Sequence, residues 1–171
     1  QVQPEDGDAE RWRARFVVDA SGRDTFFGNR LNAKRRNPKH SSSAVYAHFR
    51  QARRNEGQRE GDISIYWFEH GWFWFIPLSR GVTSVGAVVW PYYMKSRRKP
   101  VNDFLMDTIA LCPPLAARLE GAERVSEAEA TGNYSYSCDR THGPGYILIG
   151  DAFTFIDPVF SSGVWLAMHS A

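Results

Sequence analysis

Four short segments rich in β-branched and aromatic residues follow one another in the middle of the chain, and they limit the folds open to it. They cover residues 43–50, 62–69, 71–78 and 83–90. The last three are joined only by His70-Gly71 and by Ser79-Arg80-Gly81, which are long enough for hairpins and too short for crossovers. We therefore predict an antiparallel sheet.

Helices and further strands surround this sheet. An apolar run at residues 16–18 ends in a turn at "DASG" and predicts a buried strand, whereas residues 29–43 lack periodicity and predict an exposed loop. Helical spacing begins near Asn102 or Asp103, and two prolines then start a second helix. We expect helices at 101–111 and 113–121, a polar strand at 124–132, an apolar strand in "GYILIGDA", and a loop feeding a final helix. The fold class is mixed α/β (α+β).

The strand at 71–78 carries the run "GWFWFIP". Alternation places Trp72, Trp74 and Ile76 on one face and Phe73 and Phe75 on the other. Both faces are too apolar to remain in water, so we predict that both are covered.

The C-terminal segment offers the clearest candidate site. Asp151 ends the apolar strand "YILIGD", where sheet proteins place ligand-contacting groups. Ser162 and Gly163 stand at the expected helix start, where free N–H groups favour an anion. Each fragment alone is equally consistent with an ordinary strand followed by an ordinary capped helix.

The segments "GDAFTFIDPVFSSGV", "ARFVVDASGR" and "WFWFIP" together resemble the FAD-dependent halogenases. The first two resemble segments that these enzymes share with class A flavin monooxygenases, and the third matches the W-x-W-x-I-P motif associated with the halogenases. The three segments appear in the family order and span residues 14–171, nearly the whole chain.

The resemblance implies roles for individual residues. Asp151 would contact the ribityl chain of FAD, the Asp157-Pro158 turn would lie beside the flavin ring, and Ser162 with Gly163 would hold the halide through backbone N–H groups. Arg23 is left open as a structural or a phosphate-facing cation. The cofactor-binding set is Asp19, Ser21, Gly22, Gly150, Asp151, Asp157, Pro158, Gly163 and Val164; the wall of the site is Trp72, Trp74, Ile76 and Pro77.

The reaction implied is chlorination or bromination of an electron-rich aromatic substrate. It uses FAD reduced by a separate flavin reductase, molecular oxygen, and chloride or bromide, and a lysine relays the oxidant. The alternatives are an FAD-dependent aromatic monooxygenase or oxidoreductase of the same superfamily, or a non-catalytic truncated module. Dependence of product on halide separates the first two.

Two features of a complete halogenase are absent from the sequence. No G-x-G-x-x-G lies between a strand and a helix, because "GPGYILIG" precedes its strand. The catalytic lysine of the family is expected upstream, and Lys34, Lys39, Lys95 and Lys99 all lie in polar stretches that predict exposure. The first residue is not Met. We expect an internal fragment that alone neither binds FAD tightly nor halogenates, with no catalytic residue of its own.

The substrate class is suggested by Phe160. Tryptophan halogenases have a catalytic glutamate immediately before the chloride-contacting pair, and phenylalanine cannot serve as a base. Free tryptophan is therefore disfavoured, and the sequence resembles halogenases of phenols and pyrroles, some of which act on substrates tethered to a carrier protein.

Charge is distributed unevenly. Residues 30–60 hold nine Lys or Arg against two Glu, a local +7 within a net charge of +2. This run suits docking to an acidic carrier protein, although a solvated basic loop is the favoured interpretation and a nucleic-acid partner lacks any recognition motif.

Composition excludes other classes of protein. No apolar run approaches the roughly 20 residues of a membrane helix, and the charged N-terminus does not resemble a signal peptide. Cys112 and Cys138 form no CxxC, and the histidines lack ligand spacing, so neither a disulfide nor a metal site is predicted. We expect a cytoplasmic protein without membrane or nucleic-acid partners.

The motifs divide the chain into three parts. Residues 1–30 are expected to belong to an FAD-binding Rossmann-like domain, residues 31–132 to form the substrate-side antiparallel sheet and helices, and residues 133–171 to return to the FAD-binding domain.

Overall fold

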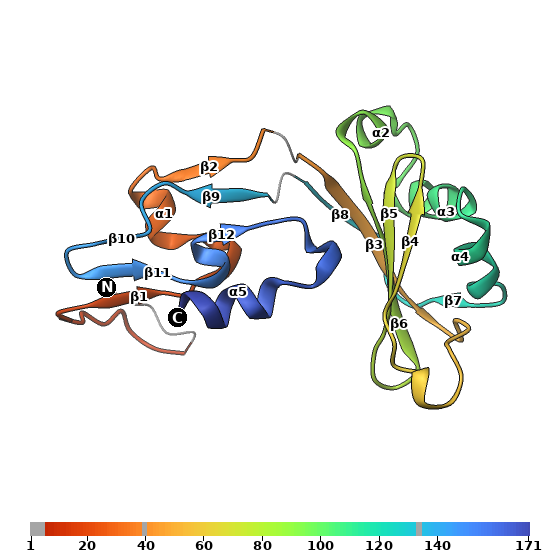
Figure 1. Ribbon diagram of the computed structural model, residues 1–171, viewed down its shortest axis with the longest axis horizontal. Helices are drawn as coiled ribbons and strands as arrows, with labels where there is room; N and C mark the ends of the chain where they lie inside the picture. The colour runs from red at the N-terminus through yellow and green to blue at the C-terminus, as the bar shows by residue number, and fades with distance from the viewer. Residues whose placement is uncertain (1–5, 39–40, 133–134) are drawn as a thin grey trace. The chain divides into compact units, whose positions relative to one another are not determined.

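The computed structural model describes residues 6–38, 41–132 and 135–171. The chain forms two compact units (Figure 1). The central unit comprises residues 37–135, and the terminal unit joins residues 1–36 to residues 136–171. Assignment of these units to substrate and to FAD stays a prediction.

The central unit is built on one antiparallel sheet. Its main strands are β3 (Ser43–Arg50), β4 (Ser64–Phe68), β5 (Gly71–Pro77) and β6 (Val82–Val89), which pair in the order β4-β5-β6-β3. Tight connections after β4 and β5 leave no room for a crossover, so neighbouring strands pair antiparallel. The predicted antiparallel sheet and the mixed fold class are confirmed.

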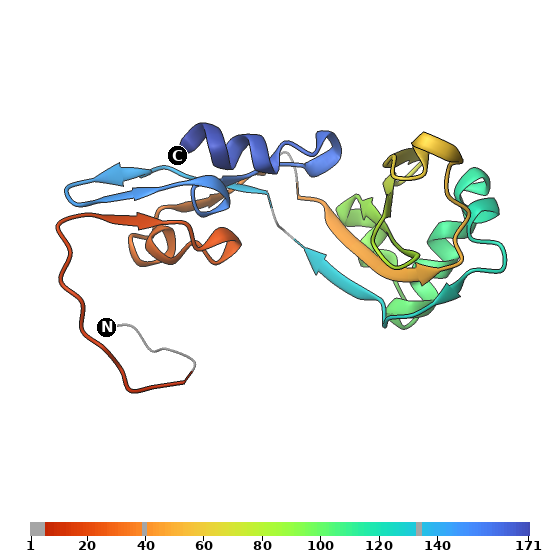
Figure 2. The same ribbon diagram turned by 90° about the horizontal axis from the view of Figure 1, so that it is seen from below.

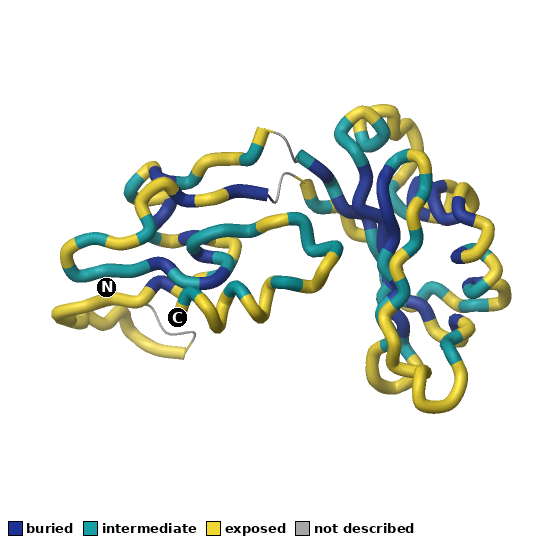
Figure 3. Tube along the Cα trace, viewed as in Figure 1, coloured by how far each residue is buried: buried dark blue, intermediate teal, exposed yellow. Residues whose placement is uncertain are grey.

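One face of this sheet is covered by helices. Phe73 and Phe75 point into a core with Leu105 of α3 (Val101–Ala110) and Leu115 of α4 (Pro113–Arg118), and all four side chains are completely buried. Figure 3 shows buried stretches of the trace on the sheet and on the helices beside it. This unit also contains α2 (Pro91–Ser96) and a 3-10 turn at Gly57–Arg59. The opposite face carries Trp72 and Trp74, as strand alternation requires.

The predicted strand at 124–132 is two strands. Both β7 (Glu123–Arg124) and β8 (Glu129–Gly132) pair with β3 (Figures 1 and 2). Between them, the Ser126 hydroxyl accepts from His48 N–H and the Asn102 side chain accepts from Ala128 N–H. These side chains thus take the place of backbone partners, and the strand is interrupted between β7 and β8.

The terminal unit contains two small sheets. β1 (Val17–Asp19) pairs parallel with β11 (Tyr146–Leu148), which pairs with β10 (His142–Gly143). The second sheet has the order β12 (Thr154–Phe155), β9 (Tyr136–Cys138) and β2 (Lys34–Arg36). The helices are α1 (Phe26–Arg30) and α5 (Gly163–Ser170), with 3-10 turns at Gly22–Asp24, Gly150–Ala152 and Pro158–Phe160.

Two predictions for this unit are wrong. The loop expected at 29–43 contains β2, which forms because Lys34–Arg36 pairs with β9 far along the chain. The strand through Phe16–Val18 is not buried, since Phe16, Val17 and Val18 are 54%, 39% and 54% exposed. Asp19 is the buried residue of β1, because the turn that follows folds over its carboxylate, which accepts hydrogen bonds from Ser21 N–H and Phe27 N–H.

No helix among the described residues is both long and apolar enough to span a membrane.

Candidate functional site

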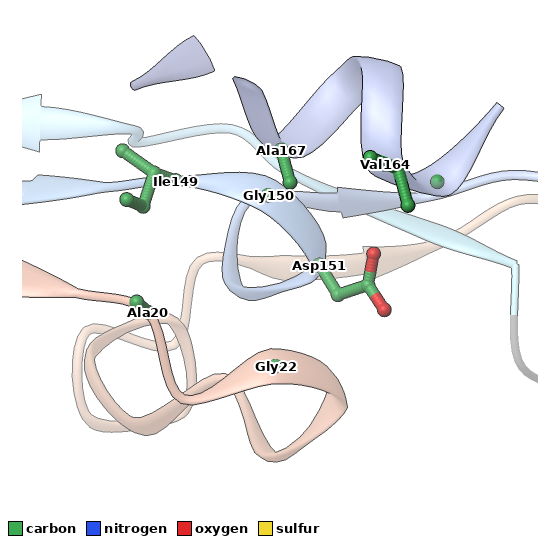
Figure 4. A pocket seen from close by; sticks show the side chains of 8 residues that line it. Ala20, Gly22, Ile149, Gly150, Asp151, Val164 and Ala167 are labelled. Atoms are coloured by element: carbon green, nitrogen blue, oxygen red, sulfur yellow. The ribbon is translucent and has the colours of Figure 1, made fainter. Parts of the chain in front are cut away.

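The terminal unit contains a pocket of about 460 Å³ (Figure 4). It lies where the turn after β1, the turn after β11 and the start of α5 meet. Its lining is dominated by small residues, which leave space for a ligand: Ala20, Gly22, Ile149, Gly150, Asp151, Gly163, Val164 and Ala167.

The turn after β1 is fixed by the buried carboxylate of Asp19. Its two oxygens accept hydrogen bonds from Ser21 N–H at 3.0 Å and Phe27 N–H at 2.7 Å. Burial acts to raise the pKa of Asp19, but hydrogen bonds from Ser21 and Phe27 outweigh it and hold the pKa below its ordinary value. The folded turn presents Gly22 to the pocket at φ +64°, and a Cβ added to this glycine would meet no atom within 4 Å.

Asp151 follows β11 on a 3-10 turn. The turn begins at Gly150, whose φ of +56° favours glycine. The Tyr136 hydroxyl donates to the main-chain oxygen of Asp151, while the carboxylate faces the pocket (Figure 4). Burial raises the pKa of Asp151, and the nearby charge of Arg23 partly opposes this. The carboxylate makes no hydrogen bond or ion pair with the described residues, so it can accept from a ligand.

The third wall is the start of α5. The first bond of this helix runs from Leu166 N–H to Ser162 C=O at 2.9 Å. The N–H groups of Gly163, Val164 and Trp165 precede it and have no partner within the helix. A Cβ on Gly163 would meet no atom within 4 Å, so the backbone there is open to a ligand. N–H groups at a helix start attract an anion.

The turn before α5 is capped locally. The Asp157 carboxylate accepts from Val159 N–H at 3.1 Å, and Pro158 begins the short 3-10 turn. Ser161 then reverses the chain at φ +52°, and Phe160 projects outward with 87% of its surface exposed.

Five of the predicted residues line the pocket: Gly22, Gly150, Asp151, Gly163 and Val164. Another five predicted residues do not line the pocket but shape the turns that form it: Asp19, Ser21, Asp157, Pro158 and Ser162. The pocket is also lined by Ala20, Ile149 and Ala167, to which the sequence analysis assigned no role. Their small or apolar side chains next to the motifs are the feature that could have identified them as pocket residues. Tyr136 supports the Asp151 turn through its hydroxyl, which donates to the main-chain oxygen of Asp151.

The predicted aromatic wall lies on the central unit. The Trp74 indole N–H donates to the Ser84 hydroxyl at 3.1 Å, and its ring lies 6.1 Å from Trp72 and 5.9 Å from Tyr46. Trp74 lies over Gly86, where a Cβ would come within 2.3 Å of the indole. Ile76 continues the same face opposite Ser84, and Pro77 ends the strand.

Lys34 is not the exposed lysine that the sequence predicts. It is partly buried, its ammonium donates to Arg23 C=O at 2.8 Å and lies 3.8 Å from the centre of the Tyr136 ring. Burial lowers its pKa. Lys99 pairs with Asp107 on the surface, and Lys39 lies outside the described residues.

The basic run at 30–60 is divided between the two units. Arg30, Lys34, Arg35 and Arg36 belong to the terminal unit, and Arg35 is paired there with Asp139 at 3.0 Å. The basic residues from Arg50 onward belong to the central unit. The run is therefore not one solvated loop, because Lys34–Arg36 forms a strand and the remaining basic residues are spread over both units. Its docking to an acidic carrier protein stays a prediction.

Comparison with known proteins identifies the family. The model of the family "Tryptophan halogenase" matches residues 1–171. A 1H-pyrrole-2-carbonyl-[peptidyl-carrier protein] chlorinase of Pseudomonas fluorescens is 32% identical over 93% of the chain and 37% of its own length. The corresponding brominase of Pseudoalteromonas luteoviolacea is 31% identical over 91% of the chain and 39% of its length.

A solved structure supports the same family. The myxobacterial chondrochloren halogenase CndH, described as an FAD-dependent halogenase, matches with a TM-score of 0.84 and 37% identity, over 91% of this chain and 37% of that one. The chain thus spans well under half the length of these relatives. With the family model matching from end to end, this chain belongs to the tryptophan halogenase family.

Proposed function

We propose that this chain is part of a flavin-dependent halogenase that chlorinates or brominates an electron-rich aromatic substrate. The observation that carries the proposal is the pocket in which the Asp151 carboxylate and the open start of α5 face one space. A carboxylate suits the hydroxyls of a ribityl chain, and unpaired N–H groups suit a halide. Family membership supports the same conclusion.

The residues present fit the flavin end of FAD. Gly22 and Gly163 leave their sides of the pocket open, so a flat ring could approach the backbone closely. When bound, FAD supplies the redox chemistry that oxidises the halide. The part of FAD that needs a phosphate cradle has no G-x-G-x-x-G in this sequence, and we assign it to a segment of the enzyme beyond this chain.

The residues of this chain would bind and orient the cofactor and the halide and would shield the site. Asp151 accepts hydrogen bonds from the cofactor, and Ser162 with Gly163 holds the halide through backbone N–H groups without a charged side chain. Asp157 and Pro158 fix the turn that leads into this helix start. Trp72 and Trp74 serve as a barrier and a scaffold and not as proton carriers, because indole has one N–H donor and no useful base.

The substrate is proposed to be a phenol or pyrrole, and in the carrier-bound case a thioester on a carrier protein. Phe160 stands where tryptophan halogenases have a catalytic glutamate, so the carboxylate that would assist the reaction of free tryptophan is absent. Two relatives whose names specify a pyrrolyl carrier-protein substrate support the tethered alternative. A separate flavin reductase and a cytoplasmic location belong to the same proposal.

The test is halide-dependent product formation by the full-length enzyme, meaning this chain together with the remainder found in its relatives. Purified enzyme is supplied with FAD, a flavin reductase, oxygen, and chloride or bromide, and offered free and carrier-tethered phenols and pyrroles. Mass spectrometry should show a halogenated product that disappears when halide is omitted. A hydroxylated product formed without halide would instead identify an aromatic monooxygenase.

A further inference from the structure

A second pocket, of about 330 Å³, lies at one end of the sheet in the central unit. It is formed where the end of β3 meets the turn between β5 and β6. Its lining is Arg50, Gln51, Ala52, Arg54, Glu60, Arg80 and Gly81. Three arginines and one glutamate therefore line the same small pocket.

The three arginines are not equivalent. Arg54 is fixed, because it donates to the main-chain oxygens of Leu78 and Val82 and lies 3.5 Å from the Glu60 carboxylate. Neither Arg50 nor Arg80 forms an ion pair with a described residue, although Glu123 of β7 stands opposite Arg50 in the sheet. The carboxylate that lines the pocket is thus already engaged, and two positive charges remain available to a ligand.

The pocket draws on residues far apart in the sequence. Arg80 stands in the β5–β6 turn, in the left-handed conformation at φ +57°, and Gly81 continues the turn at φ +71°. This turn brings Arg80 to the end of β3, where Arg50 is the last residue. The basic run at 30–60 alone could not reveal the pairing.

The position of Arg50 connects the pocket to the aromatic wall. Arg50 and Tyr46 are four residues apart on β3 and therefore lie on the same face. At 3.2–3.4 Å per residue the separation is about 13 Å. Tyr46 contacts Trp74, so a ligand held at Arg50 could extend along the sheet to the aromatic wall, which lies on the part of the chain expected to be substrate-side.

We propose that Arg50 and Arg80 bind the phosphate of a carrier protein's phosphopantetheine arm, whose thioester end holds the aromatic substrate. The inference rests on the proposed function and names its partner. Guanidinium groups match a phosphate in geometry as well as charge, and a phosphodiester retains its charge at neutral pH. The arm is a flexible linear chain, which suits the distance from the pocket to the wall.

The experiment compares two double variants of the full-length enzyme. Arg50→Ala with Arg80→Ala removes the two available charges of the pocket. Arg97→Ala with Arg98→Ala removes the same charge from exposed arginines elsewhere in the central unit and is the matched control. Three substrates carry the same acyl group: the loaded carrier protein, a phosphopantetheine thioester, and a pantetheine thioester that lacks the phosphate.

The pocket variant should raise the KM for the first two substrates about tenfold, as expected for loss of charge-assisted contacts. It should leave the KM for the pantetheine thioester unchanged, and the control should match the parent enzyme with all three. An effect on the carrier protein alone would mean that the arginines contact the protein surface, and would overturn phosphate recognition. Equal behaviour of the two double variants would also overturn it.

Binding provides a readout that does not depend on halogenation. Calorimetry with the oxidised enzyme and the phosphopantetheine-bearing carrier protein should give a dissociation constant about tenfold weaker for the pocket variant than for the control. If the enzyme bound the carrier in this way but formed no halogenated product, the proposed reaction would fail while the arginine pocket stood. If the enzyme formed the halogenated product but both variants bound the carrier protein equally well, the arginine pocket would fail and the proposed reaction would stand.

Discussion

The N–H group of Gly150 donates to the Ser170 hydroxyl at 2.8 Å, which ties the turn bearing Asp151 to the end of α5. Ser170 in turn donates to the Leu166 C=O of its own helix at 2.7 Å. One side chain therefore fixes two walls of the pocket relative to each other, the carboxylate on the turn and the helix that begins at Gly163.

Replacing Ser170 by alanine should loosen both walls. The buried N–H of Gly150 would lose its acceptor, which costs about 1–3 kcal/mol. We expect a lower melting temperature and a weaker affinity for FAD in the full-length enzyme, measured by circular dichroism and by flavin fluorescence. Ser96→Ala is the control, because Ser96 also donates to a carbonyl of its own helix and makes no side-chain hydrogen bond to a distant turn among the described residues. Identical effects of the two variants would contradict the role given to Ser170.

Asp151→Asn should stabilise the flavin-free enzyme at neutral pH. Burial raises the pKa of Asp151, so the folded state holds the proton more tightly than the unfolded state. Its contribution to stability is thus lost as the pH rises from the ordinary value of 3.8 through the raised pKa. The stability gain of the variant should be present at pH 7 and shrink as the pH falls toward 3.8 in urea unfolding. A gain that does not change with pH would contradict this origin.

Asp19→Asn should have the opposite effect. The pKa of Asp19 is lowered in the folded state, so its stabilisation is present above the unfolded value of 3.8 and is lost as the pH falls through the lower, folded pKa. Loss of the charged acceptor for Ser21 and Phe27 N–H should cost about 1.5–3 kcal/mol at pH 7. Urea unfolding measures the change. Asp139→Asn, at an exposed ion pair, should change the stability much less.

Gly86→Ala should displace the aromatic wall. The added Cβ would lie 2.3 Å from the Trp74 ring and 2.5 Å from the Tyr46 Cβ, so the sheet must shift, at a cost of about 1–3 kcal/mol. The melting temperature should fall and tryptophan fluorescence should shift. Gly61→Ala, where a Cβ meets no atom within 4 Å, should leave both unchanged. A wild-type emission spectrum for Gly86→Ala would argue against this packing.

Gly163→Ala should separate folding from ligand binding. A Cβ there meets no atom of the described chain within 4 Å, and alanine favours a helix, so stability should not fall. If the helix start holds the halide, the methyl group should raise the apparent KM for chloride about tenfold, roughly 1.4 kcal/mol. Steady-state kinetics over a chloride series tests this. An unchanged KM would place the halide elsewhere.

Local features of the sequence determined the central sheet. Strand alternation assigned Trp72 and Phe73 to opposite faces, and short turns between β4, β5 and β6 required antiparallel pairing. These predictions succeeded because a two-residue period and a tight turn each depend on neighbouring residues only. The start of α5 was predictable for the same reason. The end of β11 was not, because the strand stops at Leu148 and Asp151 lies on the 3-10 turn that follows.

Tertiary structure decided which residues far apart in the sequence come together, because the pairing of distant segments controls their positions. The parallel pairing of β1 with β11 sets Asp19 opposite Leu148 and so brings the Gly22 turn to Asp151 in one pocket. Pairing with β9 turns Lys34–Arg36 into a strand, and the β5–β6 turn delivers Arg80 to Arg50. Periodicity carries no information about such partners, because the register between distant segments depends on the energy of the whole fold. The sequence by itself therefore determined the strands, turns and motifs, whereas the fold decided which of their residues share a pocket.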